Sequence, residues 1–384
     1  MELRDGGAGC IHNCVPFRMT FMNARIIGLG TAVPYHSIER DRSVEFAHSL
    51  LYKPGREARA LPALYRMTSV QKRGSILLSA ENDTIAVDQD FYPDADHSEQ
   101  RGPTTKCRSD RYAQEAMPLA LRACREAIVD AKLEPETITH IVVITCTGFY
   151  APGIDVELIE ELGLNPETER VQVGFMGCHG AINGLRVARG LIAAEPTAKV
   201  LMVSIELCSL HYQYGWDTDR VVSNAIFADG SAAVVLSAGD EYETCPAVVA
   251  TGSRLVLDSK QAMTWRIGDY GYEMTLSAEV PGLIEAKLHG FITAWLAKQG
   301  LTLNDIGGWN VHPGGPRILL AVENALGLPK SCLEHSRAIL ADHGNMSSAT
   351  MLFIMRRFMD HKVPGPWLML GFGPGLEIEV ALVR

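Results

Sequence analysis

Cys178 is the residue of this chain best placed to act as a nucleophile. It follows a short apolar stretch, residues 171–175, which predicts a buried strand, and the turn Met176-Gly177. The next residues predict a helix whose apolar face comprises Ile182, Leu185, Ala188, Leu191 and Ile192. N–H groups and the dipole at a helix start favour the thiolate, which is the reactive form of cysteine. Most free cysteines are buried packing residues, so this segment alone leaves both interpretations open.

Two further polar residues occupy positions suited to chemistry. His312 follows a strand predicted over 309–311 and precedes Pro313-Gly314-Gly315-Pro316, a turn whose backbone the prolines and glycines constrain. A histidine at such a strand end can exchange protons near neutral pH. Asn345 precedes a strongly apolar helix, where an asparagine ordinarily serves as a helix cap.

The second half of the chain repeats the first at low sequence identity. A shift of 167 residues (345 − 178 = 167) places Gly177-Cys178 on Gly344-Asn345. Two further pairs of apolar stretches keep this shift without a gap: 200–203 with 367–370, and 142–145 with 309–312. A duplicated strand–helix unit explains the common register. The helices after Cys178 and Asn345 are apolar nearly all round, so we expect them to pack back to back between two sheets, with both N-termini at one cavity.

Strands and helices alternate along most of the chain, which predicts an α/β fold. The predicted strands are 24–33, 140–146, 171–175, 200–206 and 227–238, and residues 240–275 are expected to be rich in strands. The predicted helices are 40–51, 65–73, 112–132 and 280–298. Gly28-Leu29-Gly30 begins like a dinucleotide-binding fingerprint, but Val33 takes the place of the third glycine, so the motif is weak.

The composition excludes several classes of function. The chain has 384 residues, 47% of them hydrophobic, and a net charge of −10 without a basic cluster that could follow a nucleic-acid backbone. No apolar stretch is long enough to span a bilayer. Residues 1–21 are expected to form a disordered extension and lack the apolar core of a signal peptide. The nine cysteines are scattered, so we expect free thiols and a cytoplasmic protein.

A cysteine, a histidine and an asparagine together suggest two kinds of chemistry. A papain-like thiol hydrolase has this order along the chain, and the separation of Cys178 and His312 (312 − 178 = 134) falls within that family's range. The sequence that surrounds the papain cysteine is absent, however, and a protease would not account for the internal repeat. The second chemistry is acyl transfer with formation of a carbon–carbon bond.

Four segments carry a specific family resemblance: Met176-Gly177-Cys178, WNVHPGGPRIL, GNMSSATMLFI and GFGPGLEIE. They resemble the chalcone synthase family, the type III polyketide synthases, and the similarity covers about residues 22–384. The segment WRIGDYGYEMTLSAEVPG resembles microbial rather than plant members. The resemblance implies a duplicated, thiolase-like αβαβα fold of five layers, with one half over 22–240 carrying the cysteine and the other over 241–384 carrying the histidine and asparagine. It also implies a homodimer without a metal or a bound organic cofactor.

The resemblance further implies roles for individual residues. Cys178 would hold the starter and the growing chain as a thioester. His312 would pair with that thiolate and, with Asn345, would donate hydrogen bonds to the malonyl thioester oxygen during decarboxylation. Phe227 and Met274 match two gate positions between the coenzyme A tunnel and the chamber. The other implied substrate-binding residues are Cys146, Cys208, Ser347, Gly375 and Arg66.

Some positions depart from the family pattern. Of three basic residues that plant members use toward coenzyme A phosphates, only Arg66 persists, and Ala63 and Val70 take the other places. The alternative phosphate-binding residues are Lys72, Arg73 and Arg317. Ala151 replaces a methionine that reaches into the partner's cavity across the dimer.

The sequence therefore predicts a type III polyketide synthase that loads an acyl-CoA on Cys178, extends it with malonyl-CoA and cyclises the product to a pyrone or to a resorcinol- or phloroglucinol-type ring. The alternatives are a ketoacyl synthase III-like enzyme that makes one extension and a non-catalytic acyl-binding relative. Small or flexible side chains stand at several wall positions: Cys146, Ala151, Cys208, Ser223 and Met274. They predict an apolar channel for a fatty acyl starter, whereas the bulk of Trp265 would limit the number of extensions.

Overall fold

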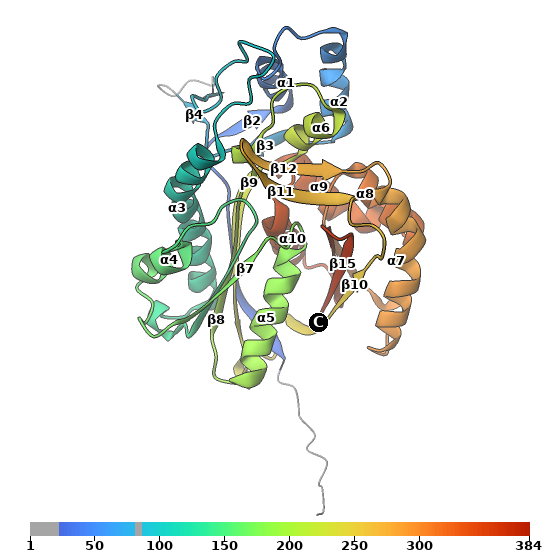
Figure 1. Ribbon diagram of the computed structural model, residues 1–384. Coiled ribbons are helices and arrows are strands. Elements are labelled where there is room, and N and C mark those ends of the chain that lie inside the picture. The colour runs from blue at the N-terminus through green and yellow to red at the C-terminus, as the bar shows by residue number, and fades with distance from the viewer. Residues whose placement is uncertain (1–22, 81–86) are drawn as a thin grey trace, which may run out of the picture.

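The computed structural model describes residues 23–80 and 87–384, and its centre is a nine-stranded sheet (Figure 1). The strands lie in the order β13-β14-β15-β10-β1-β9-β8-β6-β7. The extension predicted over residues 1–21 lies outside the described residues. Within the described residues, no helix is both long enough and apolar enough to cross a membrane.

The first half of the sheet comes from the N-terminal part of the chain. Its strands are β1 (Ala24–Ala32), β6 (His140–Thr145), β7 (Glu169–Gly174), β8 (Val200–Leu207) and β9 (Asp229–Ser237). Strand β6 runs parallel to β7 and β8, whereas β9 pairs antiparallel with β8 and β1. Strands β6, β8 and β9 are buried along their whole length, because helices or other strands cover both of their faces.

The second half repeats this arrangement. Its strands are β10 (Ala247–Leu255), β13 (Gly308–Val311), β14 (Trp367–Gly373) and β15 (Glu377–Val383). Strands β13 and β14 are parallel, and β15 pairs antiparallel with β14 and β10. Strands β13 and β14 correspond to β6 and β8, which confirms the duplication predicted from the shift of 167 residues.

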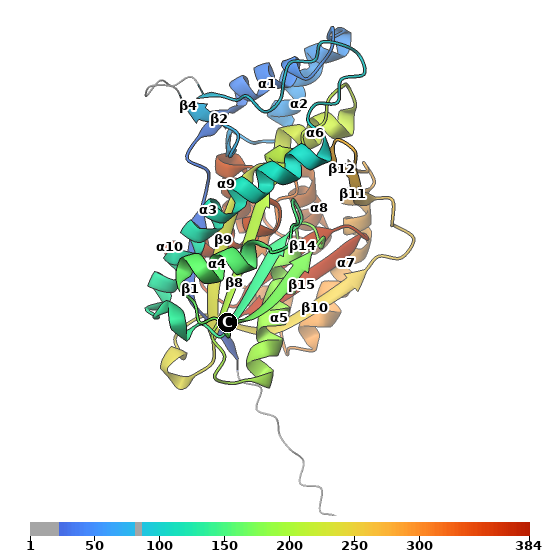
Figure 2. The same cartoon turned by 60° about the vertical axis from the view of Figure 1, so that its left-hand side comes forward.

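Helices cover both outer faces of the sheet and fill the space between its halves (Figure 2). Helices α3 (Thr105–Ala131) and α4 (Ile154–Leu162) pack on the first half, and α7 (Val280–Ala297) and α8 (Pro316–Leu326) on the second. Helices α5 (Gly180–Ala194) and α10 (Thr350–Asp360) share one hydrophobic core between the halves, as predicted. The halves are not separate sheets, however, because the pairs Ala24–Val248 and Arg25–Ala247 join β1 to β10.

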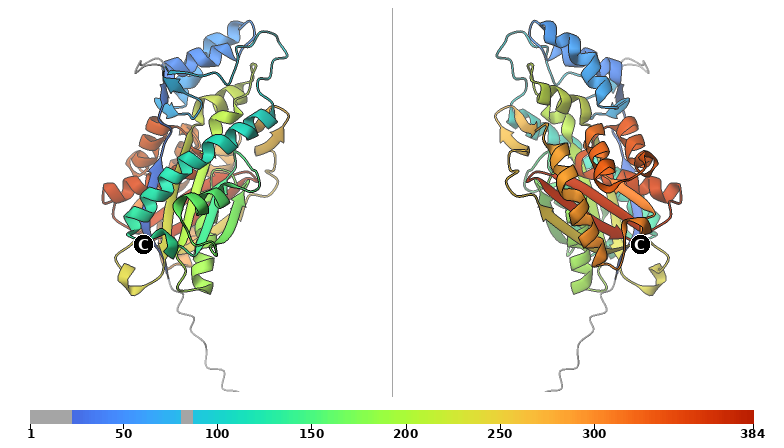
Figure 3. Two further views of the ribbon diagram at one scale, coloured as in Figure 1. Left: turned by 90° about the vertical axis from the view of Figure 1, so that its left-hand side faces the viewer. Right: turned by 90° about the vertical axis from the view of Figure 1, so that its right-hand side faces the viewer.

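A smaller cap covers the end of the sheet at which α5 begins (Figure 3). Its helices are α1 (Arg40–Ser49), α2 (Leu61–Met67) and α6 (Thr218–Ile226), with α9 (Glu334–His343) beneath them. Its strands are the pairs β2 (Ser37–Glu39) with β3 (Lys72–Gly74), β4 (Ser79–Ala80) with β5 (Val87–Asp88), and β11 (Met263–Gly268) with β12 (Gly271–Leu276). Strands β10 to β12 confirm the strand-rich character expected of residues 240–275.

Three local predictions were wrong. The helix expected over 112–132 begins earlier, at Thr105, where the Thr104 side chain caps it by accepting a hydrogen bond from the Cys107 N–H. The helix expected over 65–73 ends at Met67, where the Thr68 hydroxyl donates to the Tyr65 carbonyl and Ser69 adopts a φ of 63°. These local bonds compete with the helix ladder, and the chain then enters β3. The stretch 171–175 was predicted to be a buried strand, but β7 lies at the edge of the sheet and is partly exposed, because only one neighbouring strand covers it.

Glycines bring the longest helix against the first strand. A Cβ atom at Gly28 would lie 2.2 Å from the Ala127 carbonyl oxygen, and one at Gly30 would lie 2.2 Å from that of Ala123. Helix α3 therefore packs directly on the backbone of β1. This close approach accounts for the glycine pair that resembled a dinucleotide fingerprint.

Candidate active site

Cys178 lies in the turn between β7 and α5, and its side chain is 6% exposed. Helix α5 begins at Gly180, so the thiol lies at the helix start, as predicted. Gly177 has a φ of 83°, and a Cβ atom there would lie 2.4 Å from the ring of Pro374. Glycine is therefore required for the turn that presents Cys178.

Asn345 faces the sulfur of Cys178 from the other half of the fold. Its N–H donates to the Ile226 carbonyl (2.8 Å) and its carbonyl accepts from the Ala228 N–H (2.9 Å). The Ser347 N–H donates to Asn345 Oδ1 (2.8 Å), which orients the side-chain amide. Asn345 Nδ2 then lies 3.8 Å from the sulfur. The residue thus caps the following turn with its oxygen and presents a donor with its nitrogen.

His312 follows β13 and is buried. Its N–H donates to the Leu370 carbonyl (2.8 Å), which fixes the backbone at the strand end. Neither ring nitrogen has a hydrogen-bond partner among the described residues. Burial, together with the nearby His179, lowers the pKa of His312 to about 3. The imidazole is therefore neutral, and both of its nitrogens are free to engage a ligand.

The thiol of Cys178 differs from the sequence-based expectation. Burial raises its pKa to about 12, although hydrogen bonds from Asn345 and Ser347 oppose this rise. The helix start alone therefore does not produce a thiolate at this buried position. A neutral imidazole can accept a thiol proton, which makes His312 the candidate base.

Cys178 lines a narrow cavity of about 20 Å³. Five residues that the sequence analysis assigned to substrate binding line it: Cys146, Cys208, Phe227, Met274 and Ser347. Gly375 is not part of the lining, and its neighbour Pro374 forms that wall. Trp265 also lines the cavity, with its indole N–H donating to the Cys146 carbonyl (2.8 Å).

A second cavity of about 20 Å³ adjoins the first, and its walls include Cys208, His211, Ser223 and Trp265. Its far side consists of aromatic rings, with His211 stacked on Tyr272 at 4.1 Å between centroids. The structure therefore does not show the long apolar channel expected from small wall residues. Ala151 is exposed and does not line either cavity.

A larger groove of about 300 Å³ lies along α2, α6 and the turn that follows His312. Arg317 lines this groove and is exposed. Arg66 is also exposed but is not part of the lining; it lies on α2 next to Met67, which is. Arg73 was considered for phosphate binding, but this was wrong. Its side chain is buried, and it donates to the carbonyls of Asn224 and Phe227.

Glu206, at the end of β8, is a buried carboxyl group that the sequence analysis did not select. It accepts hydrogen bonds from the Cys146 N–H and the Thr147 hydroxyl (both 2.9 Å) and from the Ser348 hydroxyl. Burial raises its pKa to about 7, and its charge acts on Cys178. The signal in the sequence was a single acidic residue within an otherwise apolar strand.

A second polar network that was missed ties the start of α5 to β15. His179 Nδ1 and Asn183 Oδ1 lie 2.7 Å apart, and Asn183 Nδ2 donates to Glu379 (3.0 Å). Arg186 donates to both oxygens of Glu379. The spacing of 179, 183 and 186 along one helical face could have indicated this network.

Comparison with known proteins places this geometry in a family. Residues 18–240 match the family model for the N-terminal domain of chalcone and stilbene synthases, and residues 247–384 match that for the C-terminal domain. The chain is 30% identical over 365 residues to the alpha-pyrone synthesis polyketide synthase-like Pks18 of Mycobacterium tuberculosis, covering 93% of this chain and 90% of that protein.

Two further relatives support the assignment. The 1,3,6,8-tetrahydroxynaphthalene synthase of Streptomyces peucetius subsp. caesius is 31% identical, with 94% of this chain and 92% of that protein covered. The crystal structure of PKS-I from the brown alga Ectocarpus siliculosus superimposes with a TM-score of 0.87 at 31% identity, covering 94% of this chain and 98% of that one. The chain therefore belongs to the family of chalcone and stilbene synthases and has their duplicated, thiolase-like fold.

Proposed function

We propose that this protein is a type III polyketide synthase in which Cys178 carries the acyl chain. The supporting observation is the amide nitrogen of Asn345 held 3.8 Å from the sulfur, in a fold that also buries the unpartnered imidazole of His312. His312 takes the thiol proton, the thiolate attacks the carbonyl of an acyl-CoA, and the bond to the coenzyme A sulfur breaks. The imidazolium then returns its proton to the departing thiolate.

The same donors serve the decarboxylation of malonyl-CoA. The bond to the malonyl carboxylate breaks, carbon dioxide leaves, and the electron pair moves onto the thioester oxygen. Asn345 Nδ2 and a ring N–H of His312 stabilise this oxygen, and one such donor contributes roughly 3–4 kcal/mol. The resulting carbanion attacks the thioester on Cys178, which forms the carbon–carbon bond and releases the thiolate for another cycle. Cyclisation to a pyrone or to a resorcinol- or phloroglucinol-type ring follows.

Coenzyme A thioesters would approach through the groove beside Arg317, with Phe227 and Met274 between this groove and Cys178. Arg66 and Arg317 are exposed cations suited to the nucleotide phosphates. No metal or bound organic cofactor takes part in these steps. The protein is further proposed to be a cytoplasmic homodimer. The partly exposed edge of β7 offers a surface on which a second copy could pair, and light scattering tests the dimer.

The proposal predicts a covalent adduct on Cys178. Incubation of the protein with an acyl-CoA should add the mass of one acyl group, and Cys178→Ala should remove this adduct. With malonyl-CoA present, the unsubstituted protein should release carbon dioxide and form products extended more than once. A single extension would instead favour the ketoacyl synthase III-like alternative, and an undiminished adduct in Cys178→Ala would assign the nucleophile to Cys146 or Cys208. Binding without turnover would identify an acyl-binding protein.

A further inference from the structure

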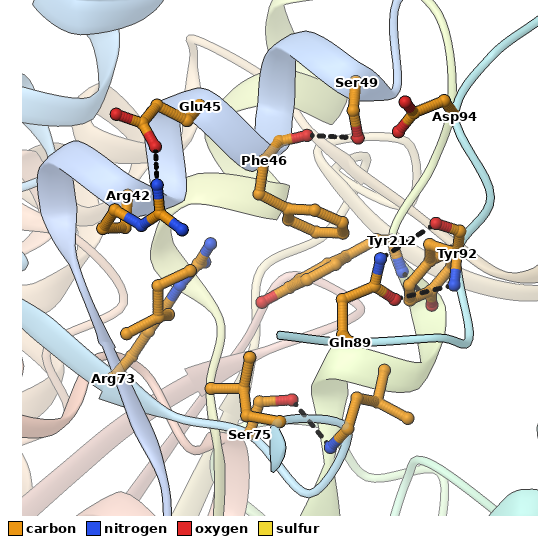
Figure 4. A pocket seen from close by; sticks show the side chains of 13 residues that line it. Arg42, Glu45, Phe46, Ser49, Arg73, Ser75, Gln89, Tyr92, Asp94 and Tyr212 are labelled. Carbon is orange, nitrogen blue, oxygen red and sulfur yellow. Dashed lines mark hydrogen bonds and ion pairs between the residues drawn. The ribbon is translucent and has the colours of Figure 1, made fainter. Parts of the chain in front are cut away.

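An outer pocket of about 200 Å³ lies within the cap and shares no lining residue with the groove along α2 and α6 (Figure 4). Helix α1 contributes Phe46 and Ser49 to its walls, and the segment around β3 contributes Arg73 and Ser75. Arg42 and Glu45 form an ion pair at this pocket. The reaction chamber, defined as the two cavities beside Cys178, does not include any of these residues in its lining.

Tyr212 is the residue that the outer pocket and the reaction chamber have in common. It lines the second cavity of the chamber together with Cys208 and Ser223, and it lines the outer pocket together with Phe46. Among the described residues that line these spaces, no other side chain belongs to both. Tyr212 therefore lies between the second cavity of the chamber and the outer pocket.

Neighbouring groups hold this ring in place. Tyr92 is stacked on it at 5.8 Å between centroids, Phe46 lies at 5.9 Å, and the Arg73 guanidinium lies over the ring at 5.2 Å. The buried Arg108 donates to the Tyr212 carbonyl (2.9 Å), and the Tyr212 N–H donates to the Tyr92 hydroxyl (3.2 Å). The contacts on both the ring and the backbone make Tyr212 a rigid wall.

The geometry points to Tyr212 as the partition that limits the length of the acyl starter, an inference that rests on the proposed function. An acyl chain held on Cys178 would extend past Cys208 and Ser223 and meet this ring. Beyond it, the outer pocket offers the apolar side chains Leu77 and Leu78, with the charged Arg42 and Glu45 also in its wall. The protein thus takes short acyl starters, and removal of the Tyr212 ring joins two existing spaces into one channel that is long enough for a longer acyl chain.

Variants of the full-length protein test this assignment with acetyl-, hexanoyl- and dodecanoyl-CoA. Tyr212→Ala removes the partition, and Tyr212→Phe retains the ring. Phe46→Ala is the matched control, because it removes a ring of similar size from the outer pocket without opening the chamber. Tyr212→Leu replaces Tyr212→Ala if circular dichroism shows that the latter is unfolded. The readouts are the acyl adduct on Cys178 by intact-protein mass spectrometry and kcat/KM with malonyl-CoA for each starter.

We expect the unsubstituted protein, Tyr212→Phe and Phe46→Ala to load dodecanoyl at about one tenth of the hexanoyl rate or less. Tyr212→Ala should raise kcat/KM for dodecanoyl-CoA by about tenfold or more, which the burial of two methylene groups suffices to supply. The kcat/KM of Tyr212→Ala for acetyl-CoA should change by less than about twofold. Equal loading of hexanoyl and dodecanoyl by the unsubstituted protein would overturn the assignment of Tyr212 as the partition. The same change in kcat/KM across the three starters in Tyr212→Ala and Phe46→Ala would also overturn it. Absence of loading with every starter would overturn the proposed function and the partition with it.

Discussion

Asn345 shows how a single side chain can combine support and chemistry. Its oxygen accepts the Ser347 N–H, and this bond leaves its nitrogen directed at the sulfur of Cys178. A carboxylate of the same shape could not donate from that position and would repel negative charge on a thioester oxygen. The proposed function therefore requires an amide at this position.

Asn345→Asp should separate acyl loading from decarboxylation. We expect the variant to retain the acyl adduct on Cys178, while carbon dioxide release from malonyl-CoA falls about a hundredfold or more. Mass spectrometry and a carbon dioxide assay provide the two readouts. Asn324→Asp makes the same chemical change at a side chain that bonds to Glu285 near the surface, and it should leave both readouts unchanged. Equal loss of loading and decarboxylation in Asn345→Asp would show that the residue is only a structural cap.

Glu206 should make stability depend on pH. Its pKa is about 7 in the folded protein against an ordinary value of 4.5, so folding favours its protonated form. The stabilisation from the protonated Glu206 carboxyl is fully present below the ordinary pKa of 4.5 and is lost as the pH rises through 7. Between these limits the unfolding free energy should fall by about 3 kcal/mol relative to that of Glu206→Gln.

Urea unfolding of both proteins at about pH 5 and about pH 8 measures this difference. Glu167→Gln alters an exposed glutamate and should shift the unfolding free energy equally at the two pH values. If the difference in unfolding free energy between the unsubstituted protein and Glu206→Gln does not vary with pH, the buried carboxyl is ionised at both pH values.

At the scale of elements, the contact between β1 and α3 depends on the absence of side chains. The Cβ positions of Gly28 and Gly30 fall 2.2 Å from backbone oxygen atoms of α3. Backbone atoms cannot move aside as a flexible side chain would, so a methyl group there must separate the strand from the helix.

Gly30→Ala should lower the unfolding free energy by about 2 kcal/mol or more because of this overpacking. Gly190→Ala is the matched control, since Gly190 lies exposed within α5 with no atom within 4 Å of its Cβ position. It should stabilise the protein by up to about 1 kcal/mol. Urea unfolding measures both changes, and a Gly30→Ala variant as stable as Gly190→Ala would contradict the close packing.

At the scale of the molecule, α5 joins the two halves of the fold through charge as well as apolar packing. Arg186 and Asn183 on α5 both bond to Glu379 on β15, and the Glu379 side chain is 1% exposed. The helix that begins beside Cys178 is thereby anchored to the half that supplies His312 and Asn345. This network is costly to break, because the buried Asn183 amide would remain without its acceptor, whereas Arg186, whose side chain is 38% exposed, keeps contact with water.

Glu379→Leu should lower the unfolding free energy by about 2 kcal/mol, since it leaves Asn183 and the partly exposed Arg186 without their acceptor. Glu45→Leu removes the acceptor of the exposed Arg42–Glu45 pair and should cost less than about 1 kcal/mol. Denaturant unfolding compares the two variants. Similar losses from both would show that the network between the halves does not hold them together.

The sequence by itself determined the repeat, most of the strands and helices, and the meeting of Cys178 with Asn345. These features depend on patterns that can be read locally or at a constant shift: apolar periodicity, turn glycines and the 167-residue register. The family resemblance then indicated which residues surround the thiol. Helix ends near Thr68 and Thr104 were less predictable, because hydroxyl side chains compete there with the backbone ladder.

Only the tertiary structure decided the protonation of Cys178 and His312, the burial of Arg73 and the carboxyl of Glu206 beside the thiol. Each depends on segments that are distant along the chain and exclude solvent from the residue. Solvent exclusion changes the free energy of ionising a side chain, and the local sequence does not show which side chains are affected. The length of the chamber is decided in the same way. Small residues at Cys208 and Ser223 predicted a channel, but Tyr212 is held across its end by rings and an arginine from distant segments.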